Sequence, residues 1–182
     1  MRCSGWLGGV AAVLSVLGCG SDDPPRPQTA FYLSLTTGAA GQCRLPGVHE
    51  LPDGARDTAI RGITSANGGV RLVDGGEDQI TCSVTSLGDG SFDVDLRLSS
   101  GAIANFSASG TLVKDEARSM SVSIAIGGSG GAFSQRDCMA TARYLAGGAV
   151  WIDNVSCPDM RQMSSPGSCA GTGALIFENC GT

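Results

Sequence analysis

Strict alternation of apolar and polar residues in the middle of the chain is the feature that most limits its fold. Across 92–98 every second side chain is apolar and those between are charged. A period of two is typical of a β-strand with one buried face. The same alternation occurs over 80–85 and 119–126, and the pair Asp89-Gly90 between the first two runs is a strong hairpin signal. The sequence therefore predicts antiparallel pairing of neighbouring strands.

A fourth strand over 103–113 completes a predicted meander, in which consecutive strands are joined by short turns. Looser apolar patterns predict further strands at residues 31–35, 70–73, 138–144, 149–155 and 174–177. Only 57–65 could form a short helix, and no internal repeat is visible. About eight or nine short strands with frequent glycine turns predict an all-β fold. We expect one antiparallel β-sandwich or flattened barrel, stapled by disulfides.

Composition limits both the core and the chemistry. The length of 182 residues suits one domain. Five Phe, two Tyr and two Trp are too few to fill its core, so aliphatic side chains must do so. Charged residues make up 16% of the chain, below the ~25% usual for soluble domains. With one histidine (His49), one lysine (Lys114) and a net charge of −5, we expect no metal, no cofactor and no nucleic-acid partner.

The first residues are typical of an export signal. Arg2 gives a positive start, and the uncharged, mostly apolar run 6–17 is shorter than the ~20 residues of a membrane-spanning helix. The run leads into Val16-Leu17-Gly18-Cys19, which resembles the lipobox of bacterial lipoproteins. An ordinary cleaved secretory signal, with Cys19 a bystander, is the alternative.

The lipobox resemblance implies cleavage before Cys19 and acylation of that cysteine. The predicted organisation is a lipoprotein signal peptide (1–18), a lipidated N-terminus with a proline-rich tether (19–29) and a β domain (30–182). Several acyl chains anchor a protein stably, so the implied partner is the lipid bilayer. In that family an aspartate after the lipidated cysteine tends to retain the protein in the inner membrane. Gly20 stands there in this chain, which implies the outer membrane.

Six cysteines remain if Cys3 leaves with the signal and Cys19 carries lipid. They are Cys43, Cys82, Cys138, Cys157, Cys169 and Cys180. An even number in an exported chain predicts three disulfides, and the spacings are too wide for Cys-x-x-Cys or zinc motifs. Of the fifteen possible connectivities, we expect Cys43–Cys82, Cys138–Cys180 and Cys157–Cys169.

The C-terminal part carries a second, looser resemblance. The segments 151–157 and 177–180, with Cys169 between them, are similar to uncharacterised bacterial lipoproteins that pair a lipobox with a cysteine-rich β domain. That family has no established activity. The resemblance therefore implies the architecture and adds no chemistry.

Two features could support nucleophilic hydrolysis. Ser129 lies in Gly127–Gly131, which matches the nucleophile elbow G-x-S-x-G, but no convincing helix or histidine follows it. His49 could act as a general base oriented by Glu50 or Asp53, but no nucleophile accompanies it. A flexible hairpin loop and an exposed loop histidine are the better interpretations. We name no catalytic residue.

Carboxylates supply two further candidates. Asp93 and Asp95 should project from one strand face ~7 Å apart, a spacing that inverting glycosidases can use. Arg97 continues that face and would lower their pKa values rather than raise them, which favours a solvated charged surface. The acidic turn 74–78, with Asp89, could hold Ca²⁺ but lacks the EF-hand order, so calcium binding stays open.

Trp151, Tyr32 and Tyr144 could form a sugar-stacking platform, although a lone tryptophan in a mature chain is more often part of the core. The sequence as a whole favours a lipid-anchored protein of the bacterial cell envelope that is structural or a binding module and not an enzyme. An envelope protein or a glycan is its expected partner. The alternative is a hydrolase of envelope or extracellular polymers that works through carboxylates.

Overall fold

The computed structural model describes residues 25–37, 70–101, 103–126, 133–162 and 167–181. All regular elements in these ranges are strands: β1 (Gln28–Thr37), β2 (Val70–Val73), β3 (Gln79–Ser86), β4 (Ser91–Ser99), β5 (Ile103–Val113), β6 (Arg118–Ile126), β7 (Phe133–Leu145), β8 (Ala149–Gln162) and β9 (Ser168–Glu178). None of the described ranges contains a helix long and apolar enough to cross a membrane. The segment 57–65, the one candidate helix, lies outside them.

The nine strands form one antiparallel sheet in the order β2-β1-β9-β8-β7-β6-β5-β4-β3. From β3 to β9 every strand pairs with the next one along the chain. The predicted meander is therefore confirmed and continues to the last strand. The all-β prediction of eight or nine antiparallel strands is confirmed as well, in the form of a flattened barrel that is open on one side.

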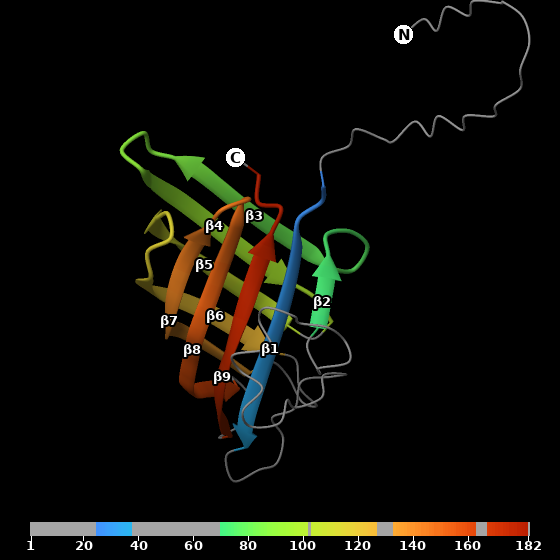
Figure 1. The fold of residues 1–182 in the computed structure, drawn as a ribbon. Coiled ribbons are helices and arrows are strands. Elements are labelled where there is room, and N and C mark those ends of the chain that lie inside the picture. The colour runs from blue at the N-terminus through green and yellow to red at the C-terminus, as the bar shows by residue number, and fades with distance from the viewer. Residues whose placement is uncertain (1–24, 38–69, 102, 127–132, 163–166, 182) are drawn as a thin grey trace, which may run out of the picture.

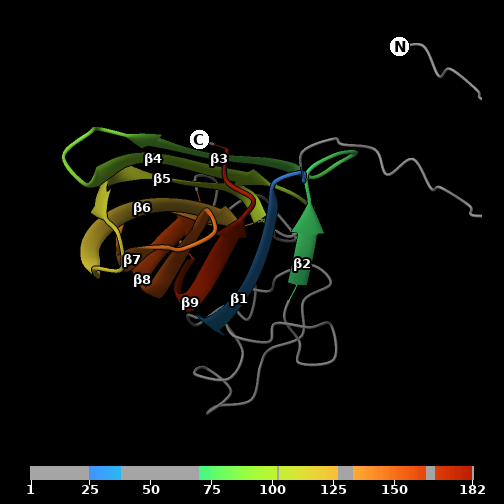
Figure 2. The ribbon, with the colours of Figure 1, turned by 45° about the horizontal axis from the view of Figure 1, so that its top comes forward.

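The sheet curls so strongly that its two ends approach each other. Strands β7, β8, β9 and β1 lie side by side as one wall, and β3, β4 and β5 cross behind them as the other (Figures 1 and 2). The end strands β2 and β3 are joined only by 74–78, a tight turn in which Gly75 and Asp78 exchange two backbone hydrogen bonds (2.9 and 3.3 Å). Five linking residues span at most ~20 Å. This short link requires the half-barrel shape.

The core fills the space between the two walls. In β4 the apolar residues Val94, Leu96 and Leu98 point inward and are buried, while the polar residues between them face outward. The rings of Phe106 on β5 and Phe177 on β9 stack across the interior with centroids 5.8 Å apart. The two rings come from opposite walls, so the period-two pattern of the sequence encodes the burial that joins them.

Bulges explain why β7 and β8 are longer than the sequence predicts. In β8 the buried residues Ile152 and Val155 are three positions apart, and the register shifts between them and again between Cys157 and Met160. Asn154 sits in the first shift with a positive φ of 52°, a conformation that asparagine tolerates better than most residues. The alternation resumes at Val155 and Cys157 and is broken again by the second bulge, so the local pattern does not mark where the strand ends.

The N-terminal boundary of the domain differs by two residues from the prediction. The proposed tether includes Gln28 and Thr29, but both belong to β1. The Gln28 amide donates to the Glu178 carboxylate (2.8 Å), and the buried Thr29 hydroxyl donates to the carbonyl of Ile176 (2.9 Å). Pairing with β9 fixes these polar residues in the sheet.

Disulfides join Cys82 to Cys180 and Cys138 to Cys157, and Cys169 is disulfide-bonded too. The prediction that the cysteines form disulfides is confirmed for the five that the structure describes. The expected pairings Cys43–Cys82, Cys138–Cys180 and Cys157–Cys169 are nevertheless wrong. The reason is the topology. Cys138 and Cys157 lie on adjacent strands with Cα atoms 4.8 Å apart, and the curl of the sheet brings the segment after β9 to β3. Cys43 and Cys19 lie outside the described residues.

β3 is the last strand of the sheet, and its unpaired edge makes backbone contacts with segments outside the sheet. Val84 donates its backbone N–H to the carbonyl of Gly181 (2.9 Å), and Gly181 donates to the carbonyl of Cys82 (3.1 Å). The backbone N–H of Ile80 donates to the Asp74 carboxylate (2.9 Å). An uncovered edge strand can pair with another chain. These contacts reduce that hazard.

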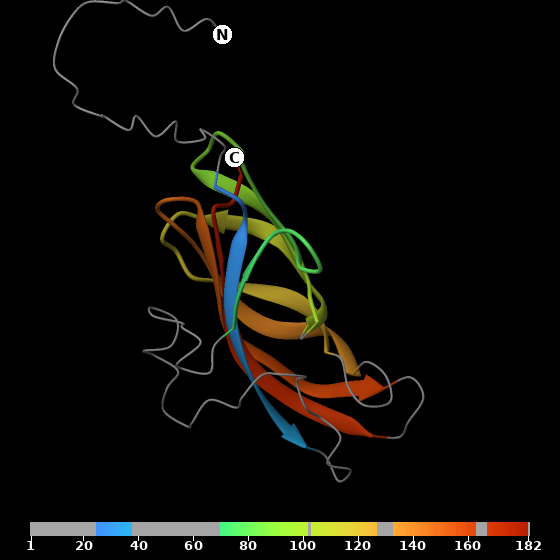
Figure 3. The same cartoon turned by 90° about the vertical axis from the view of Figure 1, so that its right-hand side faces the viewer.

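The start of β1 and the segment after β9 lie at the same end of the molecule (Figures 1 and 3). The side-chain amide of Asn179 donates to the carbonyl of Arg26 (3.0 Å) and ties the two together. Residues 25–27, which precede β1, therefore lie beside the C-terminal residues of the domain.

Candidate functional site

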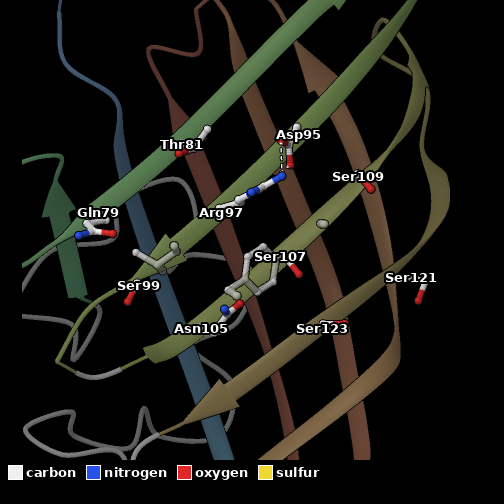
Figure 4. Close-up of a pocket in the computed structure, with 13 residues that line it drawn as sticks. Gln79, Thr81, Asp95, Arg97, Ser99, Asn105, Ser107, Ser109, Ser121 and Ser123 are labelled. Atoms are coloured by element: carbon white, nitrogen blue, oxygen red, sulfur yellow. Dashed lines mark hydrogen bonds and ion pairs between the residues drawn. The ribbon is translucent and has the colours of Figure 1, made fainter.

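A polar groove of about 760 Å³ crosses the outer face of strands β3 to β6 (Figure 4). Its lining comes from all four strands: Gln79, Thr81, Asp95, Arg97, Leu98, Ser99, Asn105, Phe106, Ser107, Ala108, Ser109, Ser121 and Ser123. The side chains of Leu98, Phe106 and Ala108 belong to the buried core. The groove surface is therefore made by the polar members of each alternating strand.

One cross-strand row forms the middle of the groove. Thr81 pairs with Arg97, Arg97 with Ser107, and Ser107 with Ser123. Neighbouring strands lie ~4.8 Å apart, so three hydroxyls and one guanidinium follow one another at regular spacing across four strands. The row exists because apolar residues in the same strands face inward at every second position.

The charged groups of the groove neutralise each other. Arg97 donates from Nε and Nη2 to the two carboxylate oxygens of Asp95, at 3.2 and 3.1 Å. The side chains keep exposed fractions of 68% and 42%, so the pair stays in contact with solvent. Asp93 is also exposed and lies on the same face. The expected solvated charged face is confirmed, and Arg97 continues it as predicted.

Most hydroxyls of the groove are available to a ligand. Ser99 donates to the carbonyl of Ala104, and Ser121 donates to the carboxylate of Asp137, both at 3.1 Å. The hydroxyls of Thr81, Ser107 and Ser123 form no hydrogen bond with any residue that the structure describes. In Figure 4 their side chains project from the outer face of β3, β5 and β6.

Two carboxyl groups elsewhere on the surface accept hydrogen bonds that favour their ionised form. The hydrogen bond from Arg161 lowers the pKa of Asp159, and the hydrogen bonds from Ser91 lower the pKa of Asp89. Nucleophilic or general-acid work by a carboxyl pair needs one group with a raised pKa. The pKa values of Asp89 and Asp159 are both lowered, which is the opposite of what this role requires.

The acidic turn is a structural feature of the fold. Asp74 accepts the backbone N–H of Ile80, and Asp89 accepts the backbone N–H of Ser91 at 2.9 Å and also its hydroxyl. Among the described residues, no group of three or more histidine, cysteine or acidic side chains could hold a metal ion. Two of the carboxylates proposed for calcium, Asp74 and Asp89, thus cap backbone groups.

The three aromatic residues proposed as a sugar platform are separated by the sheet. Tyr144 is buried in the main core, with its ring 4.5 Å from that of Phe92. Tyr32 is buried on the opposite side of the sheet, in a small cluster with Ala30 and Ala174 against which the half-buried Trp151 packs. No stacking platform of these three rings can form.

A small cavity of about 110 Å³ lies beside Trp151, lined also by Thr141, Arg143, Asp153 and Asn154. The indole Nε1 is buried without a hydrogen-bond partner in the described part of the chain. A cavity of this size can hold a few water molecules. It is too small to take an oligomer.

Several proposed residues lie outside the described ranges. They are Cys19, Cys43, His49, Glu50, Asp53 and Ser129. The roles considered for them stay predictions.

No family model, no curated protein and no solved structure matches this chain.

Sequence reasoning found the Asp95–Arg97 face but missed the groove. A signal was present, because the outward positions of β5 and β6 are serine at 107, 109, 121 and 123. Small polar residues at outward positions are also what any strand with one solvated face would carry. Only the register, which aligns them with Thr81 and Arg97, makes a continuous row.

Proposed function

We propose that the chain is an exported, lipid-anchored protein of the bacterial cell envelope, and that its β domain is a non-enzymatic binding module. The observation that carries the proposal is the disulfide bonding of all five cysteines in the described part of the chain. Structural disulfides form and persist in oxidising compartments and are rare in the cytosol. The disulfides support export without identifying a particular membrane.

The anchor is supported by the sequence before β1. The apolar run 6–17 ends in the lipobox-like Val16–Cys19, and Gly20 follows the cysteine. The proposed mature chain begins at acylated Cys19, and Gly20 favours the outer membrane. Residues 25–27, just before β1, lie at one end of the domain (Figure 3), which suits an anchor that holds the domain clear of the bilayer.

The groove favours binding over hydrolysis. Asp95 is the one carboxylate that lines it, and Arg97 occupies both of its oxygens. A carboxylate hydrolase needs two carboxyl groups on either side of the scissile bond, one of them protonated. The hydrolase alternative therefore has no partner for Asp95 in this groove.

The decisive experiment is an intact mass measured on protein extracted from the membrane fraction with detergent. Samples are alkylated before and after reduction. We expect a chain that starts at Cys19 with added acyl chains and that shows no free thiol until it is reduced. Cys19→Ser should abolish both the added acyl mass and the cleavage before residue 19, and Cys3→Ser, which alters the proposed signal only, should abolish neither.

Two results would contradict the proposal. An unacylated chain in the soluble fraction would remove the anchor, and thiols reactive before reduction at the five described cysteines would remove the argument for export. Release of new reducing ends from a polysaccharide by the purified protein would favour the hydrolase instead.

A further inference from the structure

We infer that the groove across β3 to β6 binds a neutral, polyhydroxylated chain, that is, a stretch of uncharged glycan lying across the strands. The inference rests on the proposed function, because it names the ligand class of that binding module. Three features carry it: the shape of the groove, its free hydroxyls and its balanced charge.

The shape suits an oligomer. The lining residues come from four consecutive strands, and three strand spacings of ~4.8 Å give a length of ~14 Å. The volume of about 760 Å³ lies within the ~300–1,000 Å³ of small-ligand sites. The groove crosses the strands, so a ligand would meet each strand in turn.

The side chains suit hydroxyl groups. Each serine or threonine hydroxyl offers one donor and two acceptor positions, which matches the hydroxyl of a sugar. Thr81, Ser107 and Ser123 keep this capacity, and the amides of Gln79 on β3 and Asn105 on β5 add donors and acceptors along one side of their row. Because the groove-facing side chains are polar, a lipid or another apolar ligand would gain little by burial there.

The charge balance selects a neutral ligand. Arg97 is bound at both carboxylate oxygens of Asp95, so the groove carries no net charge from this pair. An anionic polymer would compete with Asp95 for the guanidinium and would approach the uncompensated carboxylate. A neutral chain can instead accept from the remaining donors of Arg97 without breaking the pair.

The chain contains a matched control row for this groove. The row Thr81–Arg97–Ser107 lies in it, and the row Thr85–Asp93–Thr111 lies on the same face of the same three strands outside it. The test variant is Thr81→Val with Ser107→Ala, and the control is Thr85→Val with Thr111→Val. Valine keeps the shape and strand preference of threonine but removes its hydroxyl.

The experiment is affinity electrophoresis of the full chain in native gels. The protein is extracted with a detergent that has no sugar headgroup. The gels contain dextran, hydroxyethylcellulose, galactomannan or xyloglucan as neutral polymers, and alginate as an anionic one. We expect retardation by at least one neutral polymer and not by alginate. The test variant should weaken that retardation at least tenfold, and the control variant less than twofold, with both retaining the melting temperature of the parent.

Each contrary result has a distinct meaning. No retardation by any of the four neutral polymers, or equal loss in test and control variants, would overturn the glycan site. It would leave the mass and fractionation results for the anchored protein untouched. Retardation by alginate alone would also overturn the inference, since it would assign the groove to an anionic ligand.

Discussion

At the scale of single residues, two glycines of β9 show how closely the strands of one wall approach. Gly173 lies opposite Leu33 of β1, where an added Cβ would meet the carbonyl oxygen of Tyr32 and lie 2.6 Å from Leu33 Cδ2. At Gly171 the nearest atom would be the terminal methyl of Met160, at 2.7 Å. The end of a methionine can move aside. A backbone carbonyl in a paired strand cannot.

We therefore expect Gly173→Ala to lower the free energy of unfolding by ~1–3 kcal/mol, the usual cost of overpacking. Gly171→Ala should cost less. Gly101 has open space around its Cβ position, so Gly101→Ala should stay within ~0.5 kcal/mol of the parent. Urea denaturation followed by circular dichroism measures all three. An equal effect at Gly173 and Gly101 would contradict the close approach.

At the scale of elements, the edge strand β3 depends on contacts from outside itself. The charge-assisted hydrogen bond from the Ile80 backbone to Asp74 holds the turn 74–78 against the first residues of this strand. Bonds of this type contribute ~1.5–3 kcal/mol. The strand also carries two groove residues, Gln79 and Thr81.

Asp74→Ala should therefore lower the free energy of unfolding by ~1.5–3 kcal/mol. Asp74→Asn, which keeps an acceptor oxygen, should lower it by less. The exposed Glu77 of the same turn serves as the control, since Glu77→Ala should leave stability nearly unchanged. Chemical denaturation gives the ranking. Similar values for Asp74→Ala and Glu77→Ala would show that the edge does not need this carboxylate.

The strands were predictable because each has a buried face. The pairing of neighbouring strands in the meander was also predictable, but the pairing of β1 with β9 was not. All nine strands were expected, since period-two burial and the turn residues between strands are local properties. The ends of β7 and β8 were missed because register shifts next to Asp137 in β7 and between Cys157 and Met160 in β8 interrupt the alternation. The groove was missed because it depends on register across four strands.

At the scale of the whole molecule, the two described disulfides play different roles. Cys138–Cys157 joins adjacent strands that are already hydrogen-bonded, across a separation of 19 residues. Cys82–Cys180 joins the segment after β9 to the far edge strand, across 98 residues, and links the two walls. Sequence could not predict these pairings because the second one depends on the curl of the complete sheet.

Removing the long-range bridge should be the more destabilising change. In the chain-entropy account, a loop of about 100 residues contributes ~4.7 kcal/mol and one of about 15 residues ~3 kcal/mol. We expect Cys82→Ala with Cys180→Ala to lower the free energy of unfolding by ~1–2 kcal/mol more than Cys138→Ala with Cys157→Ala. All four cysteines are buried, and each double substitution removes the same two sulfur atoms. Each double variant therefore controls for the loss of buried atoms in the other. The reverse order would contradict the role assigned to the long bridge.

The contact between Asn179 and Arg26 has a consequence for the connectivity of the chain. Because β1 pairs with β2 and β9, and every strand from β3 to β8 pairs with the next one along the chain, only β2 and β3 are consecutive without pairing, and the strand order is nearly cyclic. The backbone could be opened between the exposed turn residues Ala146 and Gly147, and residues 25 and 181 joined by a short linker, without changing any strand pair. The fold thus depends on which strands are neighbours and not on the position of the N- and C-termini. This sheet is therefore a candidate for circular permutation.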